Sequence, residues 1–229
     1  MITVEKIDAY GFEAAIRGMR NPLASWDKSD SGYYLEEWDR EVFGIGGRDM
    51  ELMRKLFRGG SEHRKYMRQI YVSMDVTAPL YWWKEFDTYK VGVTADSTST
   101  MHTLHRRDLT LEDFSHDKMT LQSRVCLEYT VGVINHYRKL YVDTNDREYW
   151  DQMIQLLPTS FNQLRTVTMN YENAVNMIHQ RKHHKLTEWK EFVEVLRGLP
   201  YMIEITEGGN EGSDGVPGCD GVPGSDKED

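Results

Sequence analysis

The sequence predicts a single α+β domain in which a mixed or antiparallel sheet packs against several long helices. Residues 67–79 alternate mostly polar with mostly apolar side chains, as a strand with one packed face does. Several other segments repeat apolar residues at helical spacing. The 229 residues are 39% hydrophobic and 11% aromatic, which is enough apolar material for a sizeable core.

In the first half of the chain, local patterns predict a strand over 2–11, a helix over 12–20, a polar loop over 25–34, a helix over 46–60 and a strand over 67–79. Pro79 closes that strand and suits the first turn of the helix that follows in the aromatic stretch 81–92. Within this helix, Trp82 and Phe86 are expected in the core or in a subunit interface, because aromatic residues at helical spacing usually pack there.

In the second half, the patterns predict a hydroxyl-rich loop over 93–108, a long helix over 117–140, a helix that ends before Pro158, one helix over 160–183 and a last helix over 188–198. We expect the folded domain to span residues 1–206. Residues 207–229 repeat the motif Asp-Gly-Val-Pro-Gly and are dominated by glycine, proline and acids, so a flexible acidic tail is expected there.

The net charge and the cysteine content limit which binding partners and which cellular compartment are expected for the protein. The net charge is −9, and the tail contains seven acids against one lysine, so the body is close to neutral and no nucleic-acid partner is expected. Cys126 and Cys219 cannot form a disulfide framework, which favours a reducing cytoplasm. The chain has no apolar run of about eighteen residues and no secretory pattern at its start, so neither a membrane span nor export is expected.

Common catalytic motifs are absent from the sequence, including the P-loop, GxGxxG, GxSxG and HExxH. Two acidic pairs are typical of solvated helix faces rather than of acid–base catalysis: Glu36-Glu37 and Glu112-Asp113. His179 and His183 are spaced i, i+4, but no third ligand accompanies them, so we predict no metal site. The basic cluster 104–108 either meets a phosphate or forms a solvated turn, and the sequence leaves both interpretations open.

The segment 157–189 combines amides and cations with apolar residues at helical spacing. Its notable polar members are Asn170, Asn173, Asn176, Arg181 and Lys185. Asparagine has mediocre helix propensity, so several in one helix indicate side chains that are used for hydrogen bonding.

Two stretches of the chain together resemble the flavin-dependent thymidylate synthases of the Thy-X type. In that family a Leu-Pro pair precedes an asparagine-rich helix of the form N-x5-N-x4-R, and the matching residues here are Leu157, Pro158, Asn170, Asn176 and Arg181. The other stretch is a strand that ends in V-x-A-P, here 76–79, followed by a helix and a hydroxyl-bearing loop. The resemblance covers roughly residues 62–197.

The chain departs from the family at its signature, which is Arg-His-Arg followed after seven residues by Ser. The residues in register here are Thr88, Tyr89 and Lys90, followed by Thr98. Three further positions differ: Asp96 replaces the usual Glu, Thr100 an Arg and Lys185 a His. Because arginine and lysine are not interchangeable where a planar fork binds phosphate, these changes bear on the substrate and on catalysis.

The resemblance implies a homotetramer in which FAD lies across subunits and dUMP stacks on the flavin ring. NADPH and methylenetetrahydrofolate would be the co-substrates that reduce the flavin and provide the methyl group. Arg181 would be the catalytic residue, facing the flavin and pyrimidine carbonyls. The implied cofactor contacts are Tyr89, Lys90, Asp96, Asn170, Asn176 and Lys185. The implied substrate contacts are Glu85, Thr88, Thr98, Ser99 and Thr100.

Two functional hypotheses follow from the sequence. The first is an FAD-dependent enzyme that transfers a one-carbon unit to a pyrimidine deoxynucleotide, either dUMP to dTMP or a related modification. The retained Asn170, Asn176 and Arg181 favour it. The second is a family relative that has lost catalysis and acts as a nucleotide-binding or structural protein. The missing Arg-His-Arg cations favour this alternative.

Overall fold

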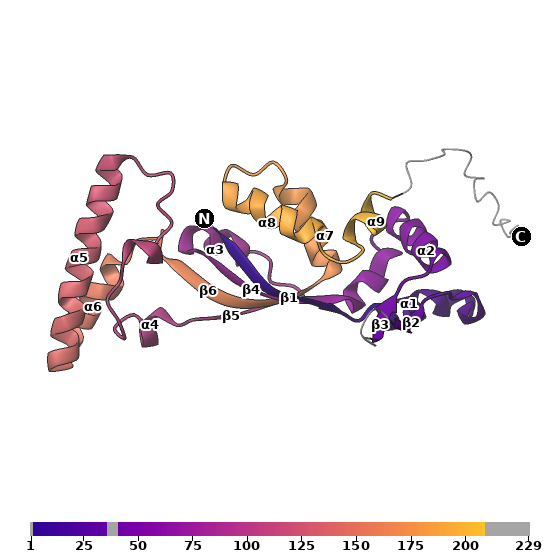
Figure 1. Cartoon of the computed structure of the whole chain (residues 1–229), viewed down its shortest axis with the longest axis horizontal. Coiled ribbons are helices and arrows are strands. Elements are labelled where there is room, and N and C mark those ends of the chain that lie inside the picture. The colour runs from indigo at the N-terminus through magenta and orange to yellow at the C-terminus, as the bar shows by residue number, and fades with distance from the viewer. Residues whose placement is uncertain (1, 36–40, 209–229) are drawn as a thin grey trace, which may run out of the picture.

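The computed structural model describes residues 2–35 and 41–208 (Figure 1). The strands are β1 (Thr3–Tyr10), β2 (Gly32–Leu35), β3 (Glu41–Gly44), β4 (Tyr71–Pro79), β5 (Val93–Ser97) and β6 (Asn162–Asn170). The helices are α1 (Phe12–Arg20), α2 (Gly47–Arg58), α3 (Leu80–Phe86), α4 (Thr100–Thr103), α5 (Leu121–Thr144), α6 (Arg147–Leu156), α7 (Tyr171–Arg181), α8 (Thr187–Arg197) and α9 (Met202–Thr206).

The central sheet has the strand order β1-β4-β6-β5, and every neighbouring pair in it is antiparallel. The longest pairing joins β4 to β6, from Tyr71 opposite Asn170 to Pro79 opposite Asn162. Figure 1 shows α7 and α8 over one face of this sheet, with α5 and α6 beyond one end and α1, α2 and α9 beyond the other. The α+β class with an antiparallel sheet, predicted from the sequence, is therefore confirmed.

The main core lies between the sheet and helices α3, α7 and α8. Its central members are fully or almost fully buried: Val72, Met74, Val76, Trp82, Trp83, Phe86, Val167, Met169, Trp189 and Phe192. The Trp82 ring stacks on Phe86 one turn later, with centroids 5.2 Å apart, and lies 4.8 Å from the ring of Trp189. The predicted burial of Trp82 and Phe86 is confirmed, and the aromatic residues of 81–92 fix α3 on the sheet.

A second, smaller core joins α5 to α6. Leu127, Val131, Ile134 and Met153 are buried in it. The first turns of α5 also expose an apolar stripe at i, i+4 spacing, formed by Leu121, Val125 and Tyr129, whose exposed fractions are 81%, 54% and 76%. Contiguous exposed apolar residues of this kind are typical of an interaction surface.

Two segments adopt structures that the sequence patterns did not predict. The single helix expected over 160–183 is wrong in its first half, where β6 pairs with β4 on one side and β5 on the other. The loop expected over 93–108 is also wrong, because it contains β5 and the short helix α4. β6 buries one face through Val167 and Met169, whereas β5 is the edge strand, and its Val93 and Ala95 are only partly buried against the core.

The predicted loop 25–34 contains the start of the β2–β3 hairpin. Its serines bind the buried carboxylate of Asp49 on α2, at 2.7 Å from both Ser29 Oγ and Ser31 Oγ. The long helix α5 runs over Leu121–Thr144 rather than over 117–140, because Thr120 caps it by accepting a hydrogen bond from the backbone N–H of Ser123.

The division into a domain of 1–206 and a tail of 207–229 stays a prediction. Glu207 lies 2.6 Å from Arg197 in an ion pair, and the Gly208 carbonyl accepts a hydrogen bond from Arg58 at 2.9 Å. The remainder of the predicted tail, with Cys219, lies outside the described residues, as does the pair Glu36-Glu37. None of the described helices combines the length and apolar character needed to span a membrane. The cytoplasmic location also stays a prediction.

Candidate functional site

The side chain of Arg181, at the end of α7, is held between α3 and the segment that links α3 to β5. Its Nε donates to the hydroxyl of Tyr89 at 2.9 Å, and its Nη1 lies 2.8 Å from Glu85 Oε2. The guanidinium carbon lies 4.7 Å from the centre of the Trp189 ring and 5.4 Å from that of Tyr89. Nη2 makes no hydrogen bond to any residue that the structure describes, so a donor remains for a ligand.

Gln180 and His184 complete this arrangement. We call the whole set the Arg181 cluster, and its members are Glu85, Tyr89, Gln180, Arg181, His184 and Trp189. The Tyr89 hydroxyl donates to Gln180 Oε1 at 2.9 Å, and His184 Nε2 lies 3.0 Å from Glu85 Oε2. The side chain of Arg181 is only 18% exposed, so its charge acts where water is largely excluded. The cluster can orient a planar polar ring and stabilise negative charge on it.

One face of α7 follows the segment 89–92. Asn173 donates from Nδ2 to the carbonyl of Val91 at 2.8 Å, and Asn176 follows it at i+3, before Gln180 at i+7. Gly92 has φ +73°, and a Cβ there would lie 2.9 Å from both Asn170 Nδ2 and Asn173 Oδ1. The glycine therefore permits a close approach between this segment and the start of α7.

Asn170 occupies a different position from the one expected. It ends β6 and caps α7, accepting a hydrogen bond from the backbone N–H of Asn173 at 3.0 Å. Its preference for a cap thus accounts for one of the asparagines. Asn176 does lie within α7, and its amide has no hydrogen-bond partner in the part of the chain that the structure describes.

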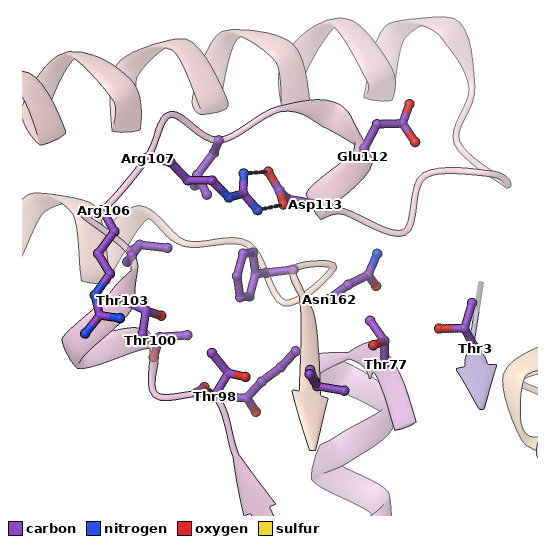
Figure 2. A pocket seen from close by; sticks show the side chains of 15 residues that line it. Thr3, Thr77, Thr98, Thr100, Thr103, Arg106, Arg107, Glu112, Asp113 and Asn162 are labelled. Carbon is purple, nitrogen blue, oxygen red and sulfur yellow. Dashed lines mark hydrogen bonds and ion pairs between the residues drawn. The ribbon is translucent and has the colours of Figure 1, made fainter. Parts of the chain in front are cut away.

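A cavity of about 580 Å³ lies at the other end of β5, where β6 begins (Figure 2). Its lining includes Thr98, Thr100, Thr103, Arg106, Phe161 and Asn162. The volume is within the range of small-molecule sites. Figure 2 shows that the side chains of Arg106, Thr100 and Thr103 gather on one side of this cavity, while Glu112 lies across from them.

The cations of the basic cluster 104–108 have separate roles. Arg107 forms a bidentate pair with Asp113, with one of its two contacts at 2.8 Å. Burial raises the pKa of the Asp113 carboxyl, but the hydrogen bonds from Arg107 and Thr110 outweigh burial and lower it below its usual value. Asp108 pairs with Arg138. The cluster is therefore mostly an ion-paired turn, and Arg106 is its member that lines the cavity without such a pair among the described residues.

The residues predicted for the site fall into two groups, separated by β5. Glu85, Tyr89 and Arg181 are in mutual contact, and Thr98 and Thr100 line the cavity. β5 has five residues and spans about 17 Å, so the two groups do not meet within one chain. The other predicted residues lie outside these contacts. Lys90, Asp96 and Lys185 are exposed, Thr88 bonds the carbonyl of Glu85, and the Ser99 carbonyl accepts from Thr103.

Sequence reasoning missed Gln180, His184 and Trp189 in the Arg181 cluster. Gln180 precedes Arg181 on α7, His184 lies in the turn after α7, and Trp189 is on α8, so no single sequence pattern groups them, and they meet only because α3 and α8 lie against α7. No group of three or more potential ligands among the described residues could hold a metal ion. His179 and His183 are both exposed.

The fold and the two groups define an α+β protein with a guanidinium between helices and a cavity of about 580 Å³ at the edge of its sheet. Thymidylate synthase X from Helicobacter pylori, solved with FAD and dUMP, has the same fold. It is 16% identical, the match covers 90% of this chain and 98% of that one, and the TM-score is 0.68.

A second similar structure is the UMP/dUMP methylase PolB from Streptomyces cacaoi, solved with 5-Br dUMP. Here the identity is 17%, the coverage 86% of this chain and 88% of that one, and the TM-score 0.59. No family model matches the sequence, and no curated protein matches it. The chain therefore has the fold of the flavin-dependent thymidylate synthases, as the resemblance in its sequence implied.

Proposed function

We propose that this protein binds FAD and a pyrimidine deoxynucleotide and transfers a one-carbon unit to the pyrimidine, converting dUMP to dTMP or making a related modification. The observation that carries the proposal is the Arg181 cluster. It presents a largely buried guanidinium with a free donor at the position where the sequence register expects the catalytic arginine.

The residues around Arg181 provide hydrogen-bond donors that match the acceptor atoms of a flavin ring. Arg181 Nη2 and the Asn176 amide make no hydrogen bond to described residues, and the exposed Lys90 adds a cation beside Tyr89. A flavin ring offers carbonyl oxygens and ring nitrogens as acceptors for such groups. The chemistry supplied by bound FAD is electron transfer, with NADPH and methylenetetrahydrofolate as co-substrates.

The protein's own part in the reaction is to bind, orient and stabilise charge. Glu85 and Tyr89 fix the plane of the Arg181 guanidinium, so that Nη2 can donate to a ring carbonyl without reorganisation. Trp189 lies beneath the guanidinium and excludes water from that side. At the other end of β5, the hydroxyls of Thr98 and Thr100 face the cavity and would bind the substrate phosphate, with Ser99 contributing backbone groups.

Binding and turnover test this function directly. We expect the purified protein to show flavin absorbance, or to acquire it when FAD is added. With dUMP, NADPH and methylenetetrahydrofolate it should form dTMP, detected by chromatography. Colourless protein that takes up no added FAD would contradict the proposal.

A homo-oligomer, a tetramer by resemblance, is part of this proposal. The Arg181 cluster and the cavity lie at opposite ends of β5, and an oligomer allows one copy to bring its Arg181 cluster beside the cavity of another. The apolar stripe Leu121, Val125 and Tyr129 offers a surface for a second copy.

Replacing Tyr129 with glutamate should therefore disperse the oligomer, because the change places a charge in a surface that a second copy covers. Light scattering after size exclusion should show a tetramer for the wild-type chain and a smaller species for the variant. Lys55→Glu, on an exposed position of α2, is the matched control and should leave the mass unchanged. A monomeric wild-type chain, or a Tyr129→Glu tetramer, would exclude this interface.

The alternative function, a nucleotide-binding relative without catalysis, is favoured by one specific observation. Two of the signature positions are occupied internally, since Thr88 bonds the Glu85 carbonyl and Tyr89 bonds Arg181 and Gln180. Neither residue brings a positive charge. Protein that binds dUMP but takes up no FAD would support this alternative.

A further inference from the structure

The charged side chains that line the cavity differ in whether they form an ion pair. The carboxylate of Asp113 is taken by Arg107, and the carboxylate of Glu112 lies across the cavity from Arg106 (Figure 2). In contrast, no described residue accepts a hydrogen bond from the guanidinium of Arg106. The side of the cavity formed by Arg106, Thr98, Thr100 and Thr103 therefore carries the positive charge.

The hydroxyl groups on that side differ in what they can donate. Thr103 Oγ1 donates to the carbonyl of Ser99 at 2.7 Å, so its proton is already used. The hydroxyls of Thr98 and Thr100 make no hydrogen bond to described residues and remain available. A guanidinium with two hydroxyl donors matches the acceptor oxygens of a phosphate group.

We propose that Arg106 is the cation that binds the phosphate in this cavity, together with the hydroxyls of Thr98 and Thr100. Thr100 occupies the position where the resembled family has an arginine, and Arg106 lies in the turn that follows α4. The cation is thus supplied from a position six residues later. The ligand is a phosphomonoester, and its identity as the 5′-phosphate of a pyrimidine nucleotide rests on the proposed function.

Calorimetric titrations of the full chain with dUMP, deoxyuridine and inorganic phosphate test this assignment. We expect Arg106→Gln to weaken dUMP binding by about 10- to 100-fold, the effect of losing a charged hydrogen-bond donor. Deoxyuridine, which lacks the phosphate, should bind both proteins equally. Arg106→Lys should recover part of the affinity, because lysine keeps the charge but not the planar fork.

The matched control is Arg48→Gln on α2, which removes an exposed arginine at the far end of the molecule from α4 (Figure 1). It should bind dUMP like the wild-type chain. The thermal unfolding of each variant is measured first, and Arg106→Gln should unfold like the wild type, since its guanidinium has no partner in the described fold.

The outcomes separate this inference from the proposed function. If the wild-type chain binds inorganic phosphate, Arg106→Gln does not, and dUMP binds neither, the Arg106 assignment holds and the proposed substrate is wrong. If dUMP binds the wild type and Arg106→Gln equally, the substrate holds and the assignment of Arg106 is overturned. A wild-type chain that binds neither phosphate nor dUMP overturns both.

Discussion

Replacing Asp49 with asparagine is expected to lower the free energy of unfolding by about 3–5 kcal/mol, because it leaves the guanidinium of Arg20 buried without a counter-charge. Both side chains are almost completely enclosed, at 5% exposure for Arg20 and 0% for Asp49, and Arg20 Nε lies 2.6 Å from Asp49 Oδ1. A buried charge that loses its partner costs far more than an exposed one.

The carboxylate of Asp49 also organises the loop that precedes β2. It accepts hydrogen bonds from Ser29 Oγ and Ser31 Oγ at 2.7 Å, and from the backbone N–H groups of Asp30 and Ser31 at 3.1 Å. A double variant, Arg20→Met with Asp49→Leu, removes both charges but leaves these donors without an acceptor. We therefore expect it to recover only part of the lost stability.

Urea unfolding followed by circular dichroism measures both effects. The control is Asp151→Asn, which breaks an exposed i, i+4 pair with Arg147 and should change the free energy of unfolding by less than about 0.5 kcal/mol. If the double variant is as stable as the wild type, the pair matters only through its charges, and its role in holding the loop is excluded.

The stability difference between the wild type and Asp49→Asn should depend on pH, because the Asp49 carboxylate can be protonated. Burial raises the pKa of Asp49, but the hydrogen bonds from Ser29, Ser31 and Arg20 outweigh it and hold the pKa below its usual value. A lowered pKa in the folded state stabilises the fold at neutral pH, and this contribution is lost as the pH falls through that value. The difference between the wild type and Asp49→Asn should therefore shrink below about pH 4.

The strands and helices that could be predicted are those with a clear period. The alternation over 67–79 identified β4, and the helix-spaced apolar residues of 46–60 identified α2. β6 was hidden because its last residue, Asn170, is followed directly by α7 with no turn residues between them. Its strand conformation depends on pairing with β4 and β5, which lie far away in the sequence.

Only part of the candidate site was predictable, because its residues, like the strands that pair with β6, lie far apart in the sequence. The register with the family located Arg181, but the partners that hold its guanidinium, Glu85 and Tyr89, precede it by more than ninety residues. Contacts across such distances arise from the packing of α3 against α7 and α8. Arg106 belonged to a basic cluster with two open interpretations, and only the cavity distinguishes it from its ion-paired neighbours.

Replacing Arg181 with alanine is expected to lower kcat by at least about 10²- to 10³-fold, the usual cost of removing a charged donor that stabilises a transition state. The change removes the Nη2 donor and leaves the cluster without its cation. Flavin affinity, measured by fluorescence quenching on titration with FAD, should fall by about tenfold or more.

A structural role for Arg181 must be separated from a functional one, because the side chain also packs on Trp189 and bonds Tyr89 and Glu85. Arg181→Ala should therefore cost about 1–3 kcal/mol of stability as well. Tyr89→Phe provides the matched control. It removes the hydroxyl that accepts from Nε but keeps the ring and the guanidinium, so its stability loss should be comparable while kcat falls by about tenfold at most.

The pair of variants then decides what the guanidinium does. If Arg181 acts on the ligand, the two proteins lose similar stability but differ by at least tenfold in kcat and in flavin affinity. If Arg181 only stabilises the fold, kcat and flavin affinity should fall in proportion to the loss of stability. The two variants should then show similar values. Equal loss in the two variants would thus mean that the cluster joins α3, α7 and α8 and that the flavin-binding residues lie elsewhere.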